Sequence, residues 1–149
     1  MKEPWLTLAV VGAVLHGNEI LLVQTHQGGD EKWQLPGGFL EKNEPPDHGI
    51  VREIYEELHV DANIAKRLGM YLRLWNGDMV IAFLIDAPSQ VLSYSHIATY
   101  DDAKKAAFFS INTLPSITLR TRRIIDDILN GCSSNLYVFC HPNDTGRLV

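Results

Sequence analysis

One helical segment, from Asp47 to His59, constrains this chain more than any other stretch, because its two sides differ sharply in chemistry. At about 100° per residue, its apolar side chains form one stripe: Ile50, Ile54 and Leu58, with Val51 and Tyr55 beside them. The other side carries three acidic side chains: Glu53, Glu56 and Glu57. The segment must therefore bury one side against a core and present a dense cluster of carboxylates on the other.

The carboxylates are neighbours, because residues three and four apart on a helix lie side by side, and each exposed like-charged pair costs roughly 0.2–0.5 kcal/mol. Arg52 neutralises only part of the cluster. A hard divalent cation resolves the repulsion, since Mg²⁺ and Mn²⁺ take carboxylate and phosphate oxygens as ligands. An EF-hand calcium loop is a poor alternative, because its spacing and its turn glycine are absent. Taken alone, the glutamates are more often a solvated acidic face.

The residues around the helix favour the metal. In order, the positions that follow a known spacing are Gly38, Glu44, Arg52, Glu53, Glu56, Glu57 and Val60. This pattern resembles the Nudix box of the Nudix hydrolases, Gly-x5-Glu-x7-Arg-Glu-U-x-Glu-Glu-x-Gly-U, where U is apolar. A chance match of the six charged or glycine positions is on the order of one in 100,000. The preceding Leu35-Pro36-Gly37-Gly38 is also typical of that family.

One position departs from the box, because His59 stands where the family has glycine. A left-handed position at a helix end prefers glycine, although histidine is among the commoner exceptions. The helix is therefore expected to end at His59 with some strain or to run on slightly. No ligand position is lost by this change.

The resemblance implies an enzyme that uses Mg²⁺ or Mn²⁺ to hydrolyse the pyrophosphate of a nucleoside diphosphate joined to another group. It implies these metal ligands: Glu53, Glu56 and Glu57, with a backbone carbonyl of Gly37 or Gly38. Arg52 is expected to pair with box carboxylates and to fix the loop onto the helix, with Glu44 as its partner. Glu41 is a further candidate, acting through water. The two glycines suit a place where backbone must approach the phosphates closely.

The general base and the contacts to the base and sugar stay open. Asp102, in the pair Asp101-Asp102, is the candidate base, with Glu53 as the alternative; an acidic pair in a loop is more often a solvated turn or a helix cap. Aromatic side chains that could stack on a nucleobase, although each is more often core, are Trp33, Trp75, Tyr71, Phe39 and His26. Asn76 and Arg73 are candidates for sugar or phosphate contacts.

The remaining pattern predicts one α/β domain over residues 1–149. Strands are expected at 7–15 and 19–24 as a hairpin, at 64–75 and 79–86 around the turn Asn76-Gly77, and near 106–110. Asp47 is expected to cap the first helix after two prolines, and a second helix is expected over 120–129, ending at Asn130-Gly131. Residues 136–139 suit an edge strand in an otherwise uncertain tail from 132 to 149. The resemblance implies an α/β/α sandwich around a mixed sheet.

Composition limits the partners. The 149 residues carry 13 Lys+Arg against 18 Asp+Glu, a net charge of -5, so the broad cationic field of a nucleic-acid coat protein is missing. Cys132 and Cys140 form no disulfide framework or Cys-x-x-Cys motif. The apolar run from Leu6 to Leu15 is too short to span a membrane and lacks a signal peptide's basic start. We therefore expect a cytoplasmic protein with a small-molecule substrate and no polymer or membrane partner.

The sequence leaves the substrate open among nucleoside triphosphates, nucleotide sugars, ADP-ribose and dinucleoside polyphosphates. ADP-ribose enzymes of the family often carry a proline beyond the box, and none lies between Pro46 and Pro88. The alternative function is a catalytically silent regulatory protein that binds a nucleotide on the same fold. Such proteins usually lose box carboxylates, and this chain keeps them, which favours catalysis. Family members are often dimers, so a homodimer is left open.

Overall fold

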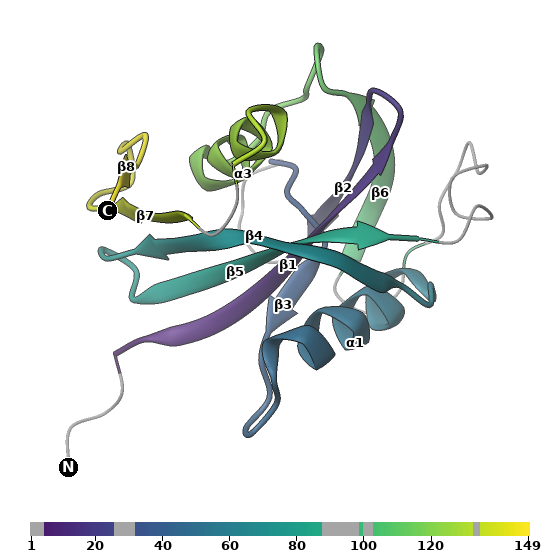
Figure 1. Cartoon of the computed structure of the whole chain (residues 1–149), viewed down its shortest axis with the longest axis horizontal. Helices are drawn as coiled ribbons and strands as arrows, with labels where there is room; N and C mark the ends of the chain where they lie inside the picture. Colours follow the sequence, from purple (N-terminus) through teal and green to yellow (C-terminus); the bar gives the residue numbers. More distant parts are fainter. Residues whose placement is uncertain (1–4, 26–31, 88–98, 100–102, 133–134) are drawn as a thin grey trace.

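The computed structural model describes residues 5–25, 32–87, 99, 103–132 and 135–149. Its centre is an eight-stranded sheet with α1 against one face and α3 against the other (Figure 1). The strands are β1 Thr7–His16, β2 Glu19–Thr25, β3 Gly37–Phe39, β4 Asn63–Arg73, β5 Asp78–Asp86, β6 Ala103–Ser110, β7 Asn135–Phe139 and β8 Arg147–Leu148, and the helices are α1 Pro46–Leu58 and α3 Leu119–Leu129. This arrangement confirms the predicted α/β class and the mixed sheet.

The sheet is mixed because β1 lies between strands of opposite directions. It pairs parallel with β5 along its length, and antiparallel with β2 near one end and with β3 nearer the other. β1 and β2 stay paired only beside their turn, at Leu15 with Ile20 and at His16 with Glu19. β2 pairs with β6 along its whole length on its other edge, and it is no longer paired with β1 beyond Ile20, which leaves the edge of β1 open for β3.

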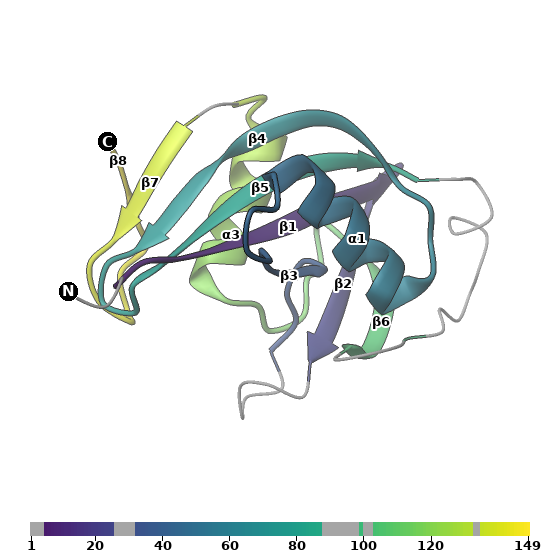
Figure 2. The same cartoon turned by 90° about the horizontal axis from the view of Figure 1, so that it is seen from below.

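Two apolar cores lie on opposite sides of the sheet, since successive residues of a strand point to opposite faces. Val10 and Val14 of β1 pack toward α1, together with Ile50 and Ile54. The neighbouring alanines of β1 pack toward α3 with Ile124 and Ile125; this second cluster also holds Tyr71. Figure 2 shows α1 crossing the sheet on one side while α3 lies behind it. Ile50, Ile54 and Leu58 of the predicted stripe are thus buried, whereas Tyr55 beside them is 51% exposed and Glu57 of the acidic side is buried.

The ends of α1 differ in how well the sequence predicted them. The prediction that Asp47 caps the helix is wrong: Pro45 occupies the cap position without a side-chain bond, and Pro46 begins the helix. Proline suits a first helical position because its ring fixes φ and its missing N–H needs no partner there. Of the two outcomes expected at His59, the helix ends there, with φ 53° and ψ 40° in the left-handed region. Its ring stacks on Tyr55 with centroids 5.4 Å apart.

The second helix and the tail follow the sequence more loosely. α3 starts at Leu119, where the Thr118 side chain accepts a hydrogen bond from Thr121 N at 3.2 Å, and it ends beside Gly131, as expected. β7 contains the predicted strand 136–139, but it lies between β4 and β8 and pairs parallel with β4. Within the described residues, no helix is both long and apolar enough to cross a membrane.

Candidate active site

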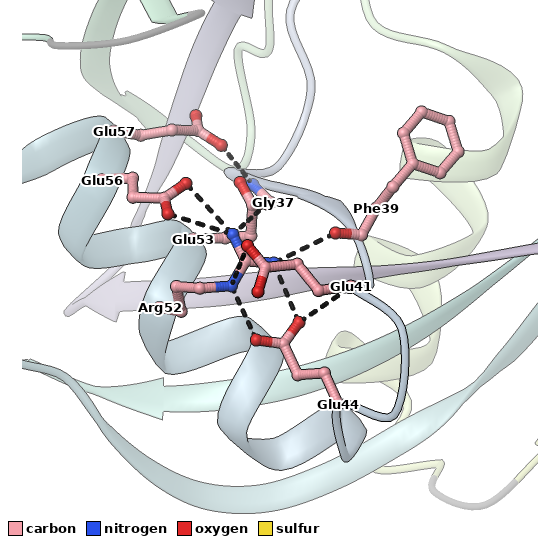
Figure 3. Close-up of polar contacts among 8 residues, drawn as sticks. All are labelled: Gly37, Phe39, Glu41, Glu44, Arg52, Glu53, Glu56 and Glu57. Carbon is pink, nitrogen blue, oxygen red and sulfur yellow. Dashed lines mark hydrogen bonds and ion pairs between the residues drawn. The ribbon is translucent and has the colours of Figure 1, made fainter.

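The three box glutamates lie on α1 where the helix faces the short strand β3 (Figure 3). The Glu57 residue is 2% exposed and its Oε1 accepts the backbone N–H of Gly37 at 3.0 Å. The side chain of Glu53 is 12% exposed, and that of Glu56 is 40% exposed. Exposure therefore increases along the cluster, from the buried carboxylate of Glu57, which binds the strand, to that of Glu56, which faces solvent.

Arg52 ties this cluster to the preceding loop. Its Nε and Nη2 donate to the two carboxylate oxygens of Glu44, at 2.7 and 2.9 Å. Nη1 donates to Glu53 at 2.9 Å and to both oxygens of Glu56 at 3.1 Å, and Nη2 reaches the carbonyl of Phe39 at 3.1 Å. Because one planar guanidinium meets both the loop and the helix, it fixes the loop relative to α1.

The loop that follows β3 is closed by Glu44. Its Oε1 also accepts the backbone N–H of Glu41 at 3.1 Å, and the Glu41 carboxylate lies 3.7 Å from Arg52 Nε. The hydrogen bond from Arg52, with the one from Glu41 N–H, lowers the pKa of Glu44 from 4.5 to about 2. In turn, the hydrogen bond to Glu44 raises the pKa of Arg52 above its usual range. The expected Arg52–Glu44 contact is thus present.

The two glycines of β3 are required by close packing. A Cβ on Gly38 would lie 2.5–2.7 Å from the carboxylate atoms of Glu53, and a Cβ on Gly37 would overlap the carbonyl of Val10. These glycines form a short strand paired with Val10 and Val11, which the sequence analysis did not predict. β3 thereby presents bare backbone to the glutamates.

A hard cation fits the donor chemistry of this site, since the side chains around it are carboxylates and the nearby strand offers backbone oxygens. As arranged, however, no three His, Cys, Asp or Glu side chains among the described residues form a group that could hold a metal ion. Figure 3 shows the contacts that these carboxylates make instead: Arg52 Nη1 reaches both Glu53 and Glu56, while Glu57 accepts from Gly37.

Of the other residues singled out from the sequence, Asp101, Asp102 and His26 lie outside the described residues. Phe39 is 57% exposed and points away from the glutamates (Figure 3). Trp33 packs edge-on against Phe109, with ring centroids 4.7 Å apart. Tyr71 is fully buried and donates to Asp127 Oδ2 at 2.6 Å, so this ring has no face left for a ligand.

A second charged cluster was not foreseen as a unit. Asp78 is 3% exposed and accepts from Arg73 through two bonds, of which Nε to Oδ1 measures 2.7 Å. Arg120 Nη1 donates to the same Oδ1 at 2.9 Å, and Asn76 Nδ2 donates to Oδ2 at 3.2 Å. The turn between Arg73 and Asp78 indicates that these two residues lie close together. No feature of the sequence indicates that Arg120 of α3 joins them.

Burial and charge act in opposite senses on this cluster. Burial alone would raise the pKa of Asp78, but the hydrogen bond from Arg73 and the charge of Arg120 outweigh it and hold the pKa below its usual range. Burial, helped by the like charge of Arg73, lowers the pKa of Arg120 from its usual range to about 10. The surroundings of Arg120 therefore destabilise the charged form of its guanidinium.

Comparison with known proteins agrees with the box. The model of the NUDIX domain matches residues 6–127. An ADP-ribose pyrophosphatase of Methanocaldococcus jannaschii is 33% identical over 127 residues, covering 82% of this chain and 72% of that protein. A MutT-like protein of Streptomyces ambofaciens is 30% identical over 82 residues, and the aligned part is 53% of its length.

Solved structures show the same fold. The crystal structure of a NUDIX hydrolase from Nitrosomonas europaea superposes with a TM-score of 0.74 at 20% identity, over 95% of this chain and 81% of that one. An ADP-ribose pyrophosphatase from Streptococcus suis gives a TM-score of 0.68 at 21% identity, over 87% and 92% of the two chains. Together with the domain match over most of the sequence, these findings establish that the chain belongs to the Nudix hydrolase family, enzymes that act on phosphoric anhydride bonds.

Proposed function

We propose that this chain is a metal-dependent pyrophosphohydrolase that cleaves a nucleoside diphosphate linked to another group. The observation that carries the proposal is the acidic face of α1, which Arg52 and Glu44 hold against the bare backbone of Gly37 and Gly38. The Methanocaldococcus jannaschii relative named as an ADP-ribose pyrophosphatase makes ADP-ribose the first substrate to test. Nucleoside triphosphates and nucleotide sugars remain within the same proposal.

Glu53, Glu56 and Glu57 would hold Mg²⁺ or Mn²⁺, with a carbonyl of Gly37 or Gly38 as a further ligand. When bound, such an ion neutralises the diphosphate and lowers the pKa of a coordinated water. Glu44 contributes by holding Arg52, so that the guanidinium keeps Glu53 beside Gly38. The N–H of Gly37 orients the buried carboxylate of Glu57. These contacts fix the direction in which the carboxylates meet the substrate phosphates.

The general base is proposed to be Asp102, with Glu53 as the alternative. The two can be separated by measuring both turnover and metal affinity. Asp102→Asn should lower kcat and leave Mn²⁺ affinity unchanged if Asp102 is the base. Glu53→Gln should weaken Mn²⁺ binding as well, because Glu53 also belongs to the acidic cluster. Unchanged kcat in Asp102→Asn would transfer the role to Glu53.

The metal assignment is tested best at Glu57. In Glu57→Gln the amide oxygen can still accept the Gly37 N–H, so the strand stays in place while the negative charge is lost. We expect loss of most ADP-ribose hydrolysis and weaker Mn²⁺ binding by electron paramagnetic resonance, and the same for Glu56→Gln. Glu19→Gln, at an exposed position of β2, is the matched control. Full turnover in both box variants would contradict the assignment.

A panel of nucleotides with Mg²⁺, with Mn²⁺ and with chelator tests the activity itself. Metal-dependent cleavage of one class would identify the substrate. Tight binding of a nucleotide without cleavage would replace the enzyme by the regulatory alternative. We further propose a cytoplasmic protein, which the free thiols of Cys132 and Cys140 support; sedimentation of the purified chain would settle whether it forms a homodimer.

A further inference from the structure

The cluster around Asp78 carries more positive than negative charge. Two guanidiniums share a single carboxylate, and the side chains of Arg73 and Arg120 are only 27% and 16% exposed. Asp78 is the acid that acts on Arg120, while Arg73 opposes it as a like charge. A surplus cation held largely out of water is costly unless an anion joins it. The arrangement is the reverse of the Arg52 cluster, where one guanidinium lies within 4.0 Å of carboxylates from Glu41, Glu44, Glu53 and Glu56.

The cluster also has hydrogen-bond donors to spare. A guanidinium offers five N–H groups, but toward the described residues Arg120 donates only through Nη1, and Arg73 only through Nε and Nη2. Arg120 Nε and Nη2 and Arg73 Nη1 make no hydrogen bond within that part of the chain. Two guanidiniums fixed by one carboxylate match a doubly charged phosphate, which accepts several such bonds at once.

The cluster lies on the face of the sheet that α3 covers, opposite α1, and Phe39 connects the two faces because its carbonyl accepts a hydrogen bond from Arg52. Asp78 and Val80 are two residues apart on β5, so their side chains lie on the same face of the sheet. Val80 packs in the core beneath α3. Val80 pairs with Ala9, which pairs with Phe39 on its other side, so the Phe39 side chain lies on the same face of the sheet as Asp78. With strands about 4.8 Å apart and a rise of about 3.3 Å per residue, the Cα atoms of Phe39 and Asp78 are about 12 Å apart.

An exposed aromatic side chain lies beside each of the two charged clusters. Phe39, whose carbonyl binds Arg52, is 57% exposed, and Trp75 is 45% exposed. Arg73 lies over the Trp75 ring, 5.3 Å from its centroid. A nucleotide whose diphosphate lies at the glutamates could extend across Phe39 and bring a second anionic group to Arg73 and Arg120.

We propose that Arg73 and Arg120 form a subsite for a phosphate monoester carried by the substrate at the end remote from the cleaved diphosphate. The inference rests on the proposed pyrophosphohydrolase function and narrows its substrate class. The enzyme should prefer nucleoside diphosphate compounds that bear such a phosphate over the same compounds without it. Asp78 acts as a positioning residue that holds both guanidiniums in place.

The test compares matched substrates: ADP-ribose against its 2′-phosphate, and dephospho-coenzyme A against coenzyme A. The wild type should show a lower KM for the phosphorylated member of at least one pair. Arg120→Met should raise that KM roughly tenfold or more, because charge-assisted bonds are lost, and should leave kcat and the KM of the other member unchanged. Asp78 keeps Arg73 as its partner in this variant, so the fold is expected to survive. Arg120→Lys should restore part of the preference.

Arg122→Met is the control, since Arg122 lies on the same helix at an exposed position. A calorimetric titration of the metal-free protein with inorganic phosphate measures binding without any catalysis. Phosphate binding that Arg120→Met abolishes, with no preference between paired substrates, would place a free phosphate there and overturn the substrate subsite. No phosphate binding and no preference would overturn the site altogether. If no panel member is cleaved, the proposed function fails, while Arg120-dependent phosphate binding would still support an anion site.

Discussion

Gly12 sets how closely α1 approaches the sheet, and Gly12→Ala should push the two apart. A Cβ at this position would lie 2.7 Å from Ile85 Cγ1, 2.9 Å from Ile54 Cδ1 and 3.3 Å from Ile50 Cδ1. Two of these three atoms belong to the buried stripe of α1. Contacts this short force side chains or the helix to move, and such overpacking costs typically about 1–3 kcal/mol. Part of this is offset by about 0.4–1 kcal/mol, because alanine restricts the unfolded chain, which leaves a net loss of about 1–2 kcal/mol.

The effect should reach catalysis, because α1 carries the acidic cluster. A helix displaced from β1 also moves Glu53 relative to Gly38, whose backbone lies against that carboxylate. Small misplacements at reacting groups reduce rates strongly. We therefore expect Gly12→Ala to lower kcat for metal-dependent ADP-ribose hydrolysis as well as the free energy of unfolding in urea.

A second substitution isolates the cause. Ile54→Val removes the Cδ1 atom that the new methyl group would meet, at a cost of about 0.5–1.5 kcal/mol when made alone. The double variant should be less destabilised than the sum of the single variants by about 1 kcal/mol. Gly17→Ala is a matched control: φ is 57° there and no atom lies within 4 Å of the added Cβ, so stability should fall without loss of activity. Wild-type stability in Gly12→Ala, or strict additivity in the double variant, would refute the packing argument.

Two further predictions concern buried and ionised hydrogen bonds. Tyr71→Phe removes the 2.6 Å hydrogen bond to the buried Asp127 and should lower the free energy of unfolding in urea by about 1.5–3 kcal/mol. Tyr55→Phe is the control: Tyr55 is 51% exposed, so this variant should change the free energy of unfolding little. The pKa of Glu44 is lowered from 4.5 to about 2 by Arg52, so the stability that this ionised carboxylate contributes is complete above pH 4.5 and is lost as the pH falls toward 2. The difference in Tm between the wild type and Glu44→Gln should accordingly be constant above pH 4.5 and shrink below it; a constant difference down to acid pH would contradict the ion pair.

Local pattern predicted the parts of the molecule that depend on neighbours along the chain. The apolar period of α1 gave its buried side, and the spacing of Arg52 and Glu44 gave their contact. The end at His59 followed from the conformations that histidine tolerates. Asp47 was assigned wrongly as the cap because Pro46 is itself able to start a helix. Each of these outcomes is decided within about a dozen residues.

The features that the sequence did not reveal depend on pairing between distant segments. Gly37 and Gly38 have low strand propensity, and they become a strand only because β2 leaves β1 and opens an edge. β7 pairs in parallel with β4, and no local sequence pattern predicts this pairing. Arg120 and Asp78 are 42 residues apart, so their contact depends on where α3 packs.

The two charged clusters have opposite imbalances, and this difference has a consequence for specificity. At Arg52, carboxylates outnumber the guanidinium and the surroundings suit a cation; at Asp78, guanidiniums outnumber the carboxylate and the surroundings suit an anion. The Cα atom of Phe39, whose carbonyl binds Arg52, lies about 12 Å from the Cα atom of Asp78. This exceeds the Debye length of about 8 Å at physiological salt, so each cluster should bind its ligand with little influence from the other. Arg120→Met should therefore leave Mn²⁺ affinity unchanged, and Glu57→Gln should leave the binding of inorganic phosphate unchanged. Loss of metal affinity in Arg120→Met would mean that the two clusters act as one site. The orientation of the substrate would then not be set by two independent charged clusters.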